Sequence, residues 1–406
     1  MMEGWKKDKL INIIAQITTG KLDANAMVPN GEYRFYTCAK DYCYIDSYAF
    51  DDEALLVSGN GEYVGYIHYY KGKFNAYQRV YVLTGFKINV KYLENYLNRY
   101  LPIRINKEVS QNNIPYIRLS TLSKMDVLFP ESLSEQASIA NILSSVDEAI
   151  DSVKKSVEAA EKLKKSMMQN LLTGRMKPDG TFRTEDEFYE DEKFGKVPKG
   201  WEVKKVKELS DSVQYGLNQA SSENGEIPML RMNNILKGKM TDFPLVYVDL
   251  NDTLLNQYKL AKGDILFNRT NSMDLVGKVG IFELDGDFVF ASYLIRVKVS
   301  PANNSSYVNY ALNSYPIQCS LRSKATPAVS QANINSNSLR NTSILIPINK
   351  DEQDMIVSII SKIEEQINNK QNQIITLERL KKSLMQNLLT GKVRVGEEGK
   401  KEVKYE

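Results

Sequence analysis

The clearest pattern along the chain is a seven-residue spacing of apolar positions, and it occurs twice. The first stretch carries Ile139, Val146, Val153, Ala160 and Met167 at this spacing, and the second carries Ile356, Ile363, Leu377 and Leu384, with Lys370 interrupting the row. A 3.5-residue period held over this length is typical of a coiled-coil seam. The pattern predicts two helical segments, 132–174 and 349–391, whose helices of roughly 38 residues would be about 57 Å long.

The two stretches are copies of one sequence. Residues 163–174 and 380–391 differ only at Met167 and Leu384, and the same offset aligns Pro130 with Pro347 and Glu135-Gln136 with Glu352-Gln353. Ser132 with Glu135, and Asn349 with Glu352, stand where a capping box begins a helix, while Gly174 and Gly391 stand where glycine ends one. We therefore predict an internal repeat in which the two helices pack antiparallel and are related by a pseudo-twofold axis. The apolar stripe is also wide enough for the helices to form their seam with the helices of a partner.

Strand-like runs bounded by Gly, Asn and Asp precede each helix. They are residues 33–36, 54–57, 65–67 and 79–83 in the first part, and 227–231, 263–267, 280–282 and 293–297 in the second. A short helix is predicted at 91–100, closed by Pro102. The fold class is α+β, with two strand-rich domains, 1–131 and 200–348, separated by the long helices. Residues 175–199 are interpreted as a solvated linker, and the charged residues 392–406 as a disordered tail.

Composition narrows the class of protein without adding a site. The 406 residues, 42% of them hydrophobic, are enough for two or more domains, and the net charge of +3 gives no global basic field. Three cysteines form no disulfide framework, so a reduced, cytoplasmic setting is expected. The N-terminal residues do not read as a signal peptide and no apolar run approaches 18 residues, so no membrane partner is expected.

The sequence gives little support for an enzyme, on three counts. Asn113-Ile114-Pro115-Tyr116 is one residue from the Asn-Pro-Pro-Tyr motif of amino-methyltransferases, but no glycine-rich cofactor loop precedes it. Gly277-Lys278-Val279 lacks the hydroxyl residue and the earlier glycine of a phosphate-binding loop. His68 is the only histidine, which argues against a His-based triad or a multi-His metal site. We predict no catalytic residue and no metal site in this chain.

The repeated fragments carry a resemblance to a known family. They are the Gly4-Trp5 and Pro198-Lys199-Gly200-Trp201 openings, the Ser-Gln-x-Asn-Ile segments at 110–114 and 330–334, the Pro and Glu-Gln positions above, and the two Gln-Asn-Leu-Leu-Thr-Gly helix ends. Over nearly its whole length the chain resembles a specificity subunit of a type I restriction–modification system.

That resemblance implies a non-catalytic subunit that binds double-stranded DNA. Each globular domain would read one half of a split, asymmetric site, while the helices set the gap and dock two adenine methyltransferase subunits. Restriction subunits, which supply translocase and nuclease activity, would join the complex. S-adenosylmethionine, and ATP with Mg, would be bound by the partner subunits and not by this chain.

Candidate DNA contacts are basic and amide side chains in polar turns, because Arg or Lys pairs with guanine and Asn or Gln with adenine. In the first domain they are Arg34, Lys40, Asn60, Tyr69, Lys71 and Lys73, within a tyrosine-rich region. In the second they are Arg231, Asn233, Asn234, Asn268, Arg269, Asn271, Ser272 and Lys324. Asn and Ser also form turns for purely structural reasons. The loop 268–272 is the favoured site, because it places Arg and Asn directly after a strand.

Two alternatives remain open from the sequence. The chain could be a coiled-coil scaffold whose globular domains bind protein and not DNA. It could also be a recognition subunit of a different assembly, such as one built around a fused restriction–methylation enzyme.

Overall fold

The computed structural model describes residues 3–108, 116–327 and 331–395, which form two compact units. Unit 1 comprises residues 1–156 and 370–406, and unit 2 comprises residues 157–369. Both long helices therefore contribute one part to each unit. The first Ser-Gln-x-Asn-Ile segment, Ser330 of the second, and the tail from residue 396 lie outside the described residues.

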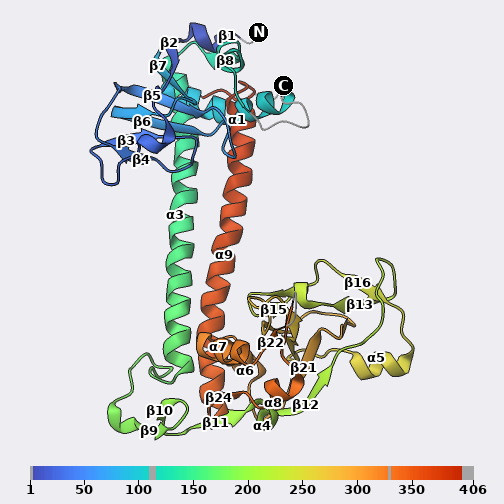
Figure 1. The fold of residues 1–406 in the computed structure, drawn as a ribbon. Coiled ribbons are helices and arrows are strands. Elements are labelled where there is room, and N and C mark those ends of the chain that lie inside the picture. The colour runs from blue at the N-terminus through green and yellow to red at the C-terminus, as the bar shows by residue number, and fades with distance from the viewer. Residues whose placement is uncertain (1–2, 109–115, 328–330, 396–406) are drawn as a thin grey trace. The chain divides into compact units, whose positions relative to one another are not determined.

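The two long helices are α3 (Leu133–Leu172) and α9 (Lys350–Leu388), and within each unit they pack antiparallel (Figure 1). In unit 1 the Nζ of Lys381 contacts Asp147 Oδ1 at 2.6 Å, and in unit 2 the Nζ of Lys164 contacts Glu364 Oε1 at 2.7 Å. The apolar seam is buried, with Leu143 in the core of unit 1 and Ile360 in the core of unit 2. The predicted pair of long antiparallel helices is confirmed.

Unit 1 holds a six-stranded sheet of order β2-β7-β5-β6-β3-β4. The strands of unit 1 are β1 (Trp5–Lys9), β2 (Ile14–Thr19), β3 (Tyr33–Tyr36), β4 (Cys43–Ile45), β5 (Phe50–Ser58), β6 (Ile67–Ala76), β7 (Val80–Phe86) and β8 (Asp126–Pro130), of which β1 and β8 form a separate pair. The shorter helices of unit 1 are α1 (Val90–Glu108) and α2 (Leu119–Ser123). Neighbouring strands are antiparallel except β3 and β6, which pair in parallel. One sheet face packs with α1 and the start of α3 into a single core.

Helix α1 continues past Pro102, so the predicted end of that helix is wrong. Proline costs a helix one hydrogen bond and some strain. The turn beyond it places Ile105, 4% exposed, in the same core as Leu101, which is fully buried. Burying that apolar side chain offsets the cost of the proline.

Unit 2 holds a six-stranded sheet of order β12-β21-β17-β19-β15-β14 and two three-stranded sheets, β16-β13-β20 and β18-β23-β22. The strands are β9 (Phe188–Asp191), β10 (Gly195–Pro198), β11 (Trp201–Lys205), β12 (Ser210–Tyr215), β13 (Ile227–Leu230), β14 (Ile235–Leu236), β15 (Lys239–Met240), β16 (Val246–Val248), β17 (Ile265–Asn268), β18 (Thr270–Asn271), β19 (Val279–Ile281), β20 (Val289–Phe290), β21 (Leu294–Val299), β22 (Thr326–Pro327), β23 (Ala332–Asn333) and β24 (Ser343–Pro347). The helices are α4 (Val206–Leu209), α5 (Asp252–Tyr258), α6 (Ser305–Leu312), α7 (Tyr315–Ser323) and α8 (Ser336–Arg340). The α+β fold class, with two strand-rich domains, is confirmed.

Each domain is joined to its long helix through the same small collar. Antiparallel β1 and β8 pair Trp5 with Pro130, and antiparallel β11 and β24 pair Trp201 with Pro347. In both collars a buried glutamine of the long helix donates to the proline carbonyl and accepts from a backbone N–H of the domain. The bonds are Gln136 to Pro130 (2.7 Å) and from Asn89 (2.7 Å), and Gln353 to Pro347 (2.9 Å) and from Asn304 (2.8 Å). The sequence repeat is therefore also a repeat of hydrogen bonds.

The glutamates at the two helix starts bind arginines that follow the other helix. Arg394 Nε and Nη2 contact the two carboxylate oxygens of Glu135 at 2.7 and 2.8 Å in unit 1. In unit 2, Arg183 Nη2 donates to Glu352 Oε1 at 2.6 Å, and Arg183 Nη1 donates to the Gly174 carbonyl at 2.7 Å. The predicted capping boxes are thus incomplete, because the described contacts of both glutamate side chains go to these residues and to Trp201 Nε1.

We call the pairing of each arginine with the glutamate of the other helix a clasp. The clasp in unit 2, Arg183 with Glu352, lies beside a part of the predicted linker that is structured. Residues 188–198 form the antiparallel pair β9 and β10, and Arg183 precedes it. In unit 1 the clasp is formed by Arg394, which lies among the described residues 392–395 of the segment expected to be disordered. In both units, residues beyond the terminal glycine of one helix hold the start of the other.

Replacing Arg183 with alanine is expected to destabilise unit 2 more than replacing Arg394 destabilises unit 1. The Arg183 and Glu352 side chains are only 8% and 19% exposed, whereas Arg394 is 47% exposed. We expect losses of about 3 kcal/mol for Arg183→Ala and about 1 kcal/mol for Arg394→Ala. Trp201 lies in unit 2 and Trp5 in unit 1, so urea unfolding of Trp5→Phe and Trp201→Phe backgrounds, followed by tryptophan fluorescence, reports each unit separately. Equal losses would contradict the ranking by burial.

Candidate nucleic-acid interface

In the first domain the structure builds a basic and aromatic surface around Arg34. This residue lies on β3, and its guanidinium carbon is 4.3 Å from the ring centroid of Tyr42 and 4.6 Å from that of Tyr70. Its Nη1 donates to the Tyr36 hydroxyl at 3.4 Å. Several tyrosines of the same region remain between one third and one half exposed: Tyr42, Tyr44, Tyr48 and Tyr66. Exposed rings that hold a cation are suited to contact bases and phosphates.

Two predicted lysines lie over rings in the same way. Lys40 Nζ is 5.2 Å from the centroid of Tyr63, and Lys73 Nζ is 4.7 Å from that of Tyr48. His68 Nε2 donates to the Ala39 carbonyl at 3.0 Å, and burial lowers the pKa of His68. This hydrogen bond ties the partly buried imidazole to the backbone.

Other candidates of the first domain lie apart from Arg34. Successive residues of a strand point to opposite faces, so Tyr69 of β6 lies on the face opposite Tyr70. Its hydroxyl donates to Glu53 at 2.8 Å, and burial with this bond raises the pKa of Tyr69 to about 12. Lys71 alternates onto the face of Tyr69, and Asn60 forms a backbone bridge with Tyr116. The structure therefore brings Arg34 and the aromatic surface together but not all of the predicted residues.

In the second domain three segments distant in sequence meet at Arg269. Its guanidinium carbon lies 4.8 Å from the ring centroid of Tyr215, and its Nη2 donates to Asn333 Oδ1 at 3.4 Å. Strand β18, which follows Arg269, pairs with β23, which carries Asn333. Asn271 Nδ2 contacts Met232 Sδ at 3.4 Å and so brings in the loop after β13. Arg269 and Asn271 therefore belong to one cluster, and Arg231 directly precedes its member Met232 in the chain.

This cluster has hydrogen-bonding capacity that the described residues leave unused. The Nε atoms of Arg231 and Arg269 are buried and have no partner among the described residues. The contacts of Asn333, to Arg269 at 3.4 Å and to Thr270 Oγ1 at 3.3 Å, are long. Buried polar atoms in native proteins are usually satisfied. A ligand rich in acceptors, placed on this cluster, would satisfy them.

Two predicted amides of the second domain are buried and shape the loops. Asn234 is fully buried, and its Nδ2 donates to the carbonyls of Thr241 and Pro244. Asn268 is also fully buried and donates to the Leu275 carbonyl at 3.2 Å. Asn233 and Ser272 are exposed beside them. The buried pair holds the loops in place, and the exposed residues are the ones available to a ligand.

Lys324 follows α7 and lies near the 188–198 hairpin. Burial and the charge of Lys193 lower the pKa of Lys324. No described contact connects it to Arg269.

Sequence reasoning missed two members of the cluster, Tyr215 and Asn333. Asn333 could have been found, because it lies in the repeated Gln-x-Asn-Ile segment. Tyr215 gives no such signal, since it reaches Arg269 only through the pairing of β12 in the sheet.

The described residues contain no group of three or more His, Cys, Asp or Glu placed to bind a metal ion. Within the same residues, no helix combines the length and the apolar character needed to cross a bilayer.

Comparison with known families and proteins gives a consistent result. The family model for the type I restriction modification DNA specificity domain matches residues 2–162 and 198–379. The chain is 39% identical over 177 residues to the type I restriction enzyme EcoDI specificity subunit of Escherichia coli, covering 42% of this chain and 38% of that protein. It is 28% identical over 305 residues to the MjaIX specificity subunit of Methanocaldococcus jannaschii, covering 72% and 66%. The matched regions thus span from 38% to 66% of these relatives' lengths.

Solved structures share the fold. The S subunit of a type I restriction-modification system from M. genitalium superposes with a TM-score of 0.61 at 16% identity, covering 95% of this chain and 96% of that one. A chain from a structure of type I restriction–modification complex assembly and conformational transition gives a TM-score of 0.54 at 13% identity, covering 96% and 98%.

Proposed function

Because the chain belongs to the type I restriction–modification DNA specificity family, we propose that it is the DNA-recognition subunit of such a system and that each globular domain reads one half of a bipartite site. One observation carries the proposal. Two domains built on one repeated collar carry unlike clusters, an arginine among tyrosines in the first and an arginine with amides in the second. A common frame with unlike surfaces suits a site whose halves differ in sequence.

The chemistry of each cluster matches base recognition in a groove. Arg269 has the donors that pair with O6 and N7 of guanine, and Asn333 and Asn271 have the donor and acceptor that pair with N6 and N7 of adenine. In the first domain, the rings around Arg34 supply contact area and the guanidinium supplies the donors. Charge supplied locally in this way is consistent with a net charge of only +3.

We propose that the long helices set the gap between the half-sites. Helix α3 has 40 residues and α9 has 39, which at 1.5 Å per residue gives about 60 Å. Half-sites read from one face of B-DNA lie about one helical turn, roughly 34–36 Å, apart. The bases between them would be left unread.

The helix ends support docking of two copies of one partner, which we propose are methyltransferase subunits. The repeated segments place Leu163 and Leu380 on the surface, 51% and 46% exposed. Lys165, Ser166 and Gln169 are exposed, as are their counterparts Lys382, Ser383 and Gln386. Exposed residues that are identical in both copies contribute little to the core. Their identity is explained if each copy binds the same partner surface.

Replacing one exposed leucine with glutamate is expected to remove one methyltransferase subunit from the complex. Leu163→Glu or Leu380→Glu should each reduce the stoichiometry from two to one, and the double variant should bind none, as measured by native mass spectrometry. A charge placed in a buried apolar contact is strongly unfavourable. Met355→Glu is the matched control, because Met355 is 49% exposed but its counterpart in the repeat is Ser138. Two bound subunits in the double variant would reject this docking surface.

We further propose that this chain performs no chemistry. S-adenosylmethionine, and ATP with Mg, would be used by the methyltransferase and restriction subunits. No glycine-rich cofactor loop precedes the Asn-Ile-Pro-Tyr segment in the sequence, and the only histidine contacts a backbone carbonyl.

The central test is to express the chain with the methyltransferase subunit of its own system in a host without adenine methylation. Long-read sequencing should then show methylated adenines in one bipartite motif with a fixed gap. A gel-shift assay on random duplexes, with and without the methyltransferase subunit, separates DNA recognition from a protein-binding scaffold. Absence of both a motif and a shift would reject the proposal.

A further inference from the structure

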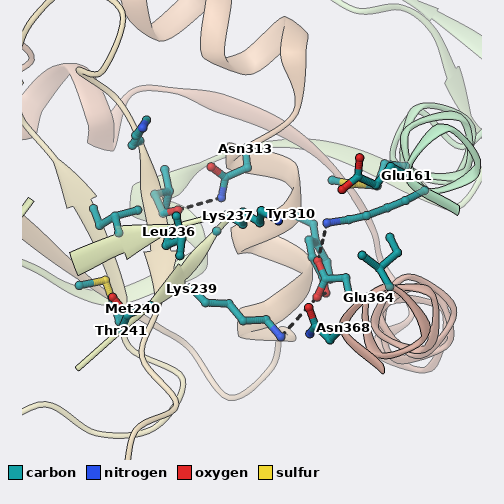
Figure 2. A pocket seen from close by; sticks show the side chains of 17 residues that line it. Glu161, Leu236, Lys237, Lys239, Met240, Thr241, Tyr310, Asn313, Glu364 and Asn368 are labelled. Carbon is teal, nitrogen blue, oxygen red and sulfur yellow. Dashed lines mark hydrogen bonds and ion pairs between the residues drawn. The ribbon is translucent and has the colours of Figure 1, made fainter. Parts of the chain in front are cut away.

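One buried carboxylate of α9 connects both long helices to the second domain. Glu364 is 8% exposed, and its Oε1 accepts from Lys164 of α3. Its Oε2 accepts a hydrogen bond from the Tyr310 hydroxyl at 3.0 Å and pairs with Lys239 Nζ at 3.4 Å. Tyr310 lies on α6 and Lys239 on β15, so two separate elements of the domain meet one helical side chain (Figure 2).

The equivalent position in the other unit has only the contact between helices. Asp147 and Lys381 are the repeat counterparts of Glu364 and Lys164. Lys381 Nζ lies 2.6 and 2.7 Å from the two oxygens of Asp147, whose side chain is 44% exposed against 9% for Glu364. Among the described residues of unit 1, no side chain of the first domain hydrogen-bonds to Asp147. The ion pair between the two helices therefore occurs in both units. Among the described residues, only in unit 2 does the carboxylate of that pair also bind side chains of the globular domain.

At Glu364 the contact between the domain and the helices is polar. A pocket of about 800 Å³ lies between the β14–β15 hairpin and the helices, lined on the domain side by residues that include Leu236 and Lys237 (Figure 2). The apolar side chains of α9 that join the core of the domain are Ile356 and Ile360. Glu364 is four residues beyond Ile360, about 6 Å at 1.5 Å per residue. A polar contact one turn beyond the apolar core restricts the angle at which the domain meets the helix.

We propose that Glu364 is a positioning residue that fixes the angle of the second domain on the long helices and thereby restricts the gap between half-sites. The inference about the gap rests on the proposed function, whereas the inference about the angle does not. Removing one member of a buried charge pair leaves its partners unpaired. The contacts to the domain should therefore be lost together when the carboxylate is neutralised.

The angle can be measured without DNA or partner subunits. Cys319 of α7 and Gln366 of α9 are exposed, so spin labels on Cys319 and Gln366→Cys, in a Cys38→Ser, Cys43→Ser background of the full chain, report the distance between domain and helix. Pulsed EPR should give one narrow distribution. Glu364→Gln should broaden or shift it, and the matched control Asp147→Asn should leave it unchanged.

Tyr310→Phe removes the hydrogen bond from the domain to Glu364 and keeps the ion pair between Lys164 and Glu364. It should shift or broaden the distribution in the same direction, and it maintains the test if Glu364→Gln does not fold. Unchanged distributions in both variants would overturn the inference. A change of equal size in Asp147→Asn would also overturn it, because the helix pair alone would then set the angle.

The consequence for the gap is read by methylation sequencing of the complex. Glu364→Gln should raise methylation at gaps one base pair longer or shorter by about tenfold, since small misplacements alter such rates strongly. Both half-site sequences should be unchanged. A single gap in this variant would refute the link between angle and gap. A wild-type chain without a bipartite motif would instead refute the proposed function.

Discussion

Removing seven residues from each long helix is expected to abolish methylation at the original gap and to shorten the preferred gap by up to about three base pairs. Seven residues correspond to about 10.5 Å of helix, and one base pair to about 3.4 Å. Deleting whole heptads keeps the apolar seam in phase. Residues 150–156 and 372–378 are the facing segments, since the pairs Asp147–Lys381 and Lys164–Glu364 bracket them.

The control variant keeps both helices at full length and changes only exposed side chains within residues 150–156, the segment that the deletion removes from α3. Asp151→Ala with Ser152→Ala alters two exposed side chains of α3 and should leave the gap as in the wild type. Long-read methylation sequencing reads the gap in both variants. If the shortened chain methylates the original gap, the helices do not determine the distance between the half-sites.

Arg269→Ala is expected to relax one position of one half-site and to leave the other half-site intact. The guanidinium lies over Tyr215 and against Asn333, and its Nε is buried without a described partner. Loss of a good bidentate base contact costs about 1–3 kcal/mol of discrimination. Methylation sequencing should therefore show a degenerate base in one half of the motif.

Two further variants serve as a control and as a test of the first domain. Arg340→Ala removes an exposed arginine of α8 in the same unit and should leave the motif unchanged. Arg34→Ala should relax the other half-site. Equal relaxation of both halves by Arg269→Ala would mean that the two domains do not read DNA independently.

The long helices and the repeat could be predicted because their signal is local and occurs twice. The seven-residue period identifies a helix from its own residues, and the aligned Pro and Glu-Gln positions locate the collars. The strand at 33–36 was likewise found with the bounds that β3 has. In each case the sequence contains the determining interaction within a few residues.

Features that depend on distant partners were not predictable. The order of the strands joins β3 to β6 in parallel and places β2 beside β7, which no local pattern specifies. The acidic run after α3 indicates a solvated segment, because a run of charges does not show that Arg183 is matched by Glu352, 169 residues later. Pro102 predicts a helix end because its local cost is visible in the sequence, whereas the burial of Ile105 is not.

The candidate site shows the same division. A polar loop after a strand predicts Arg269 and Asn271 as contacts, and the structure brings them together with Asn333 and Tyr215. The same rule predicts Asn234 and Asn268, yet both are fully buried. Residue type and spacing do not reveal whether an amide in a turn faces solvent or the backbone of its own loop.

The collars have a consequence for how such a molecule can change. The chain arrives in each globule on one strand and departs on the antiparallel strand beside it, Trp5 opposite Pro130 and Trp201 opposite Pro347. Everything between those strands is a cassette whose ends are already held together by the frame. One cassette can lengthen, shorten or be exchanged while the helices keep their register. New pairs of cassettes could thus arise by recombination within the duplicated segments, without any change to the surfaces proposed to dock a partner.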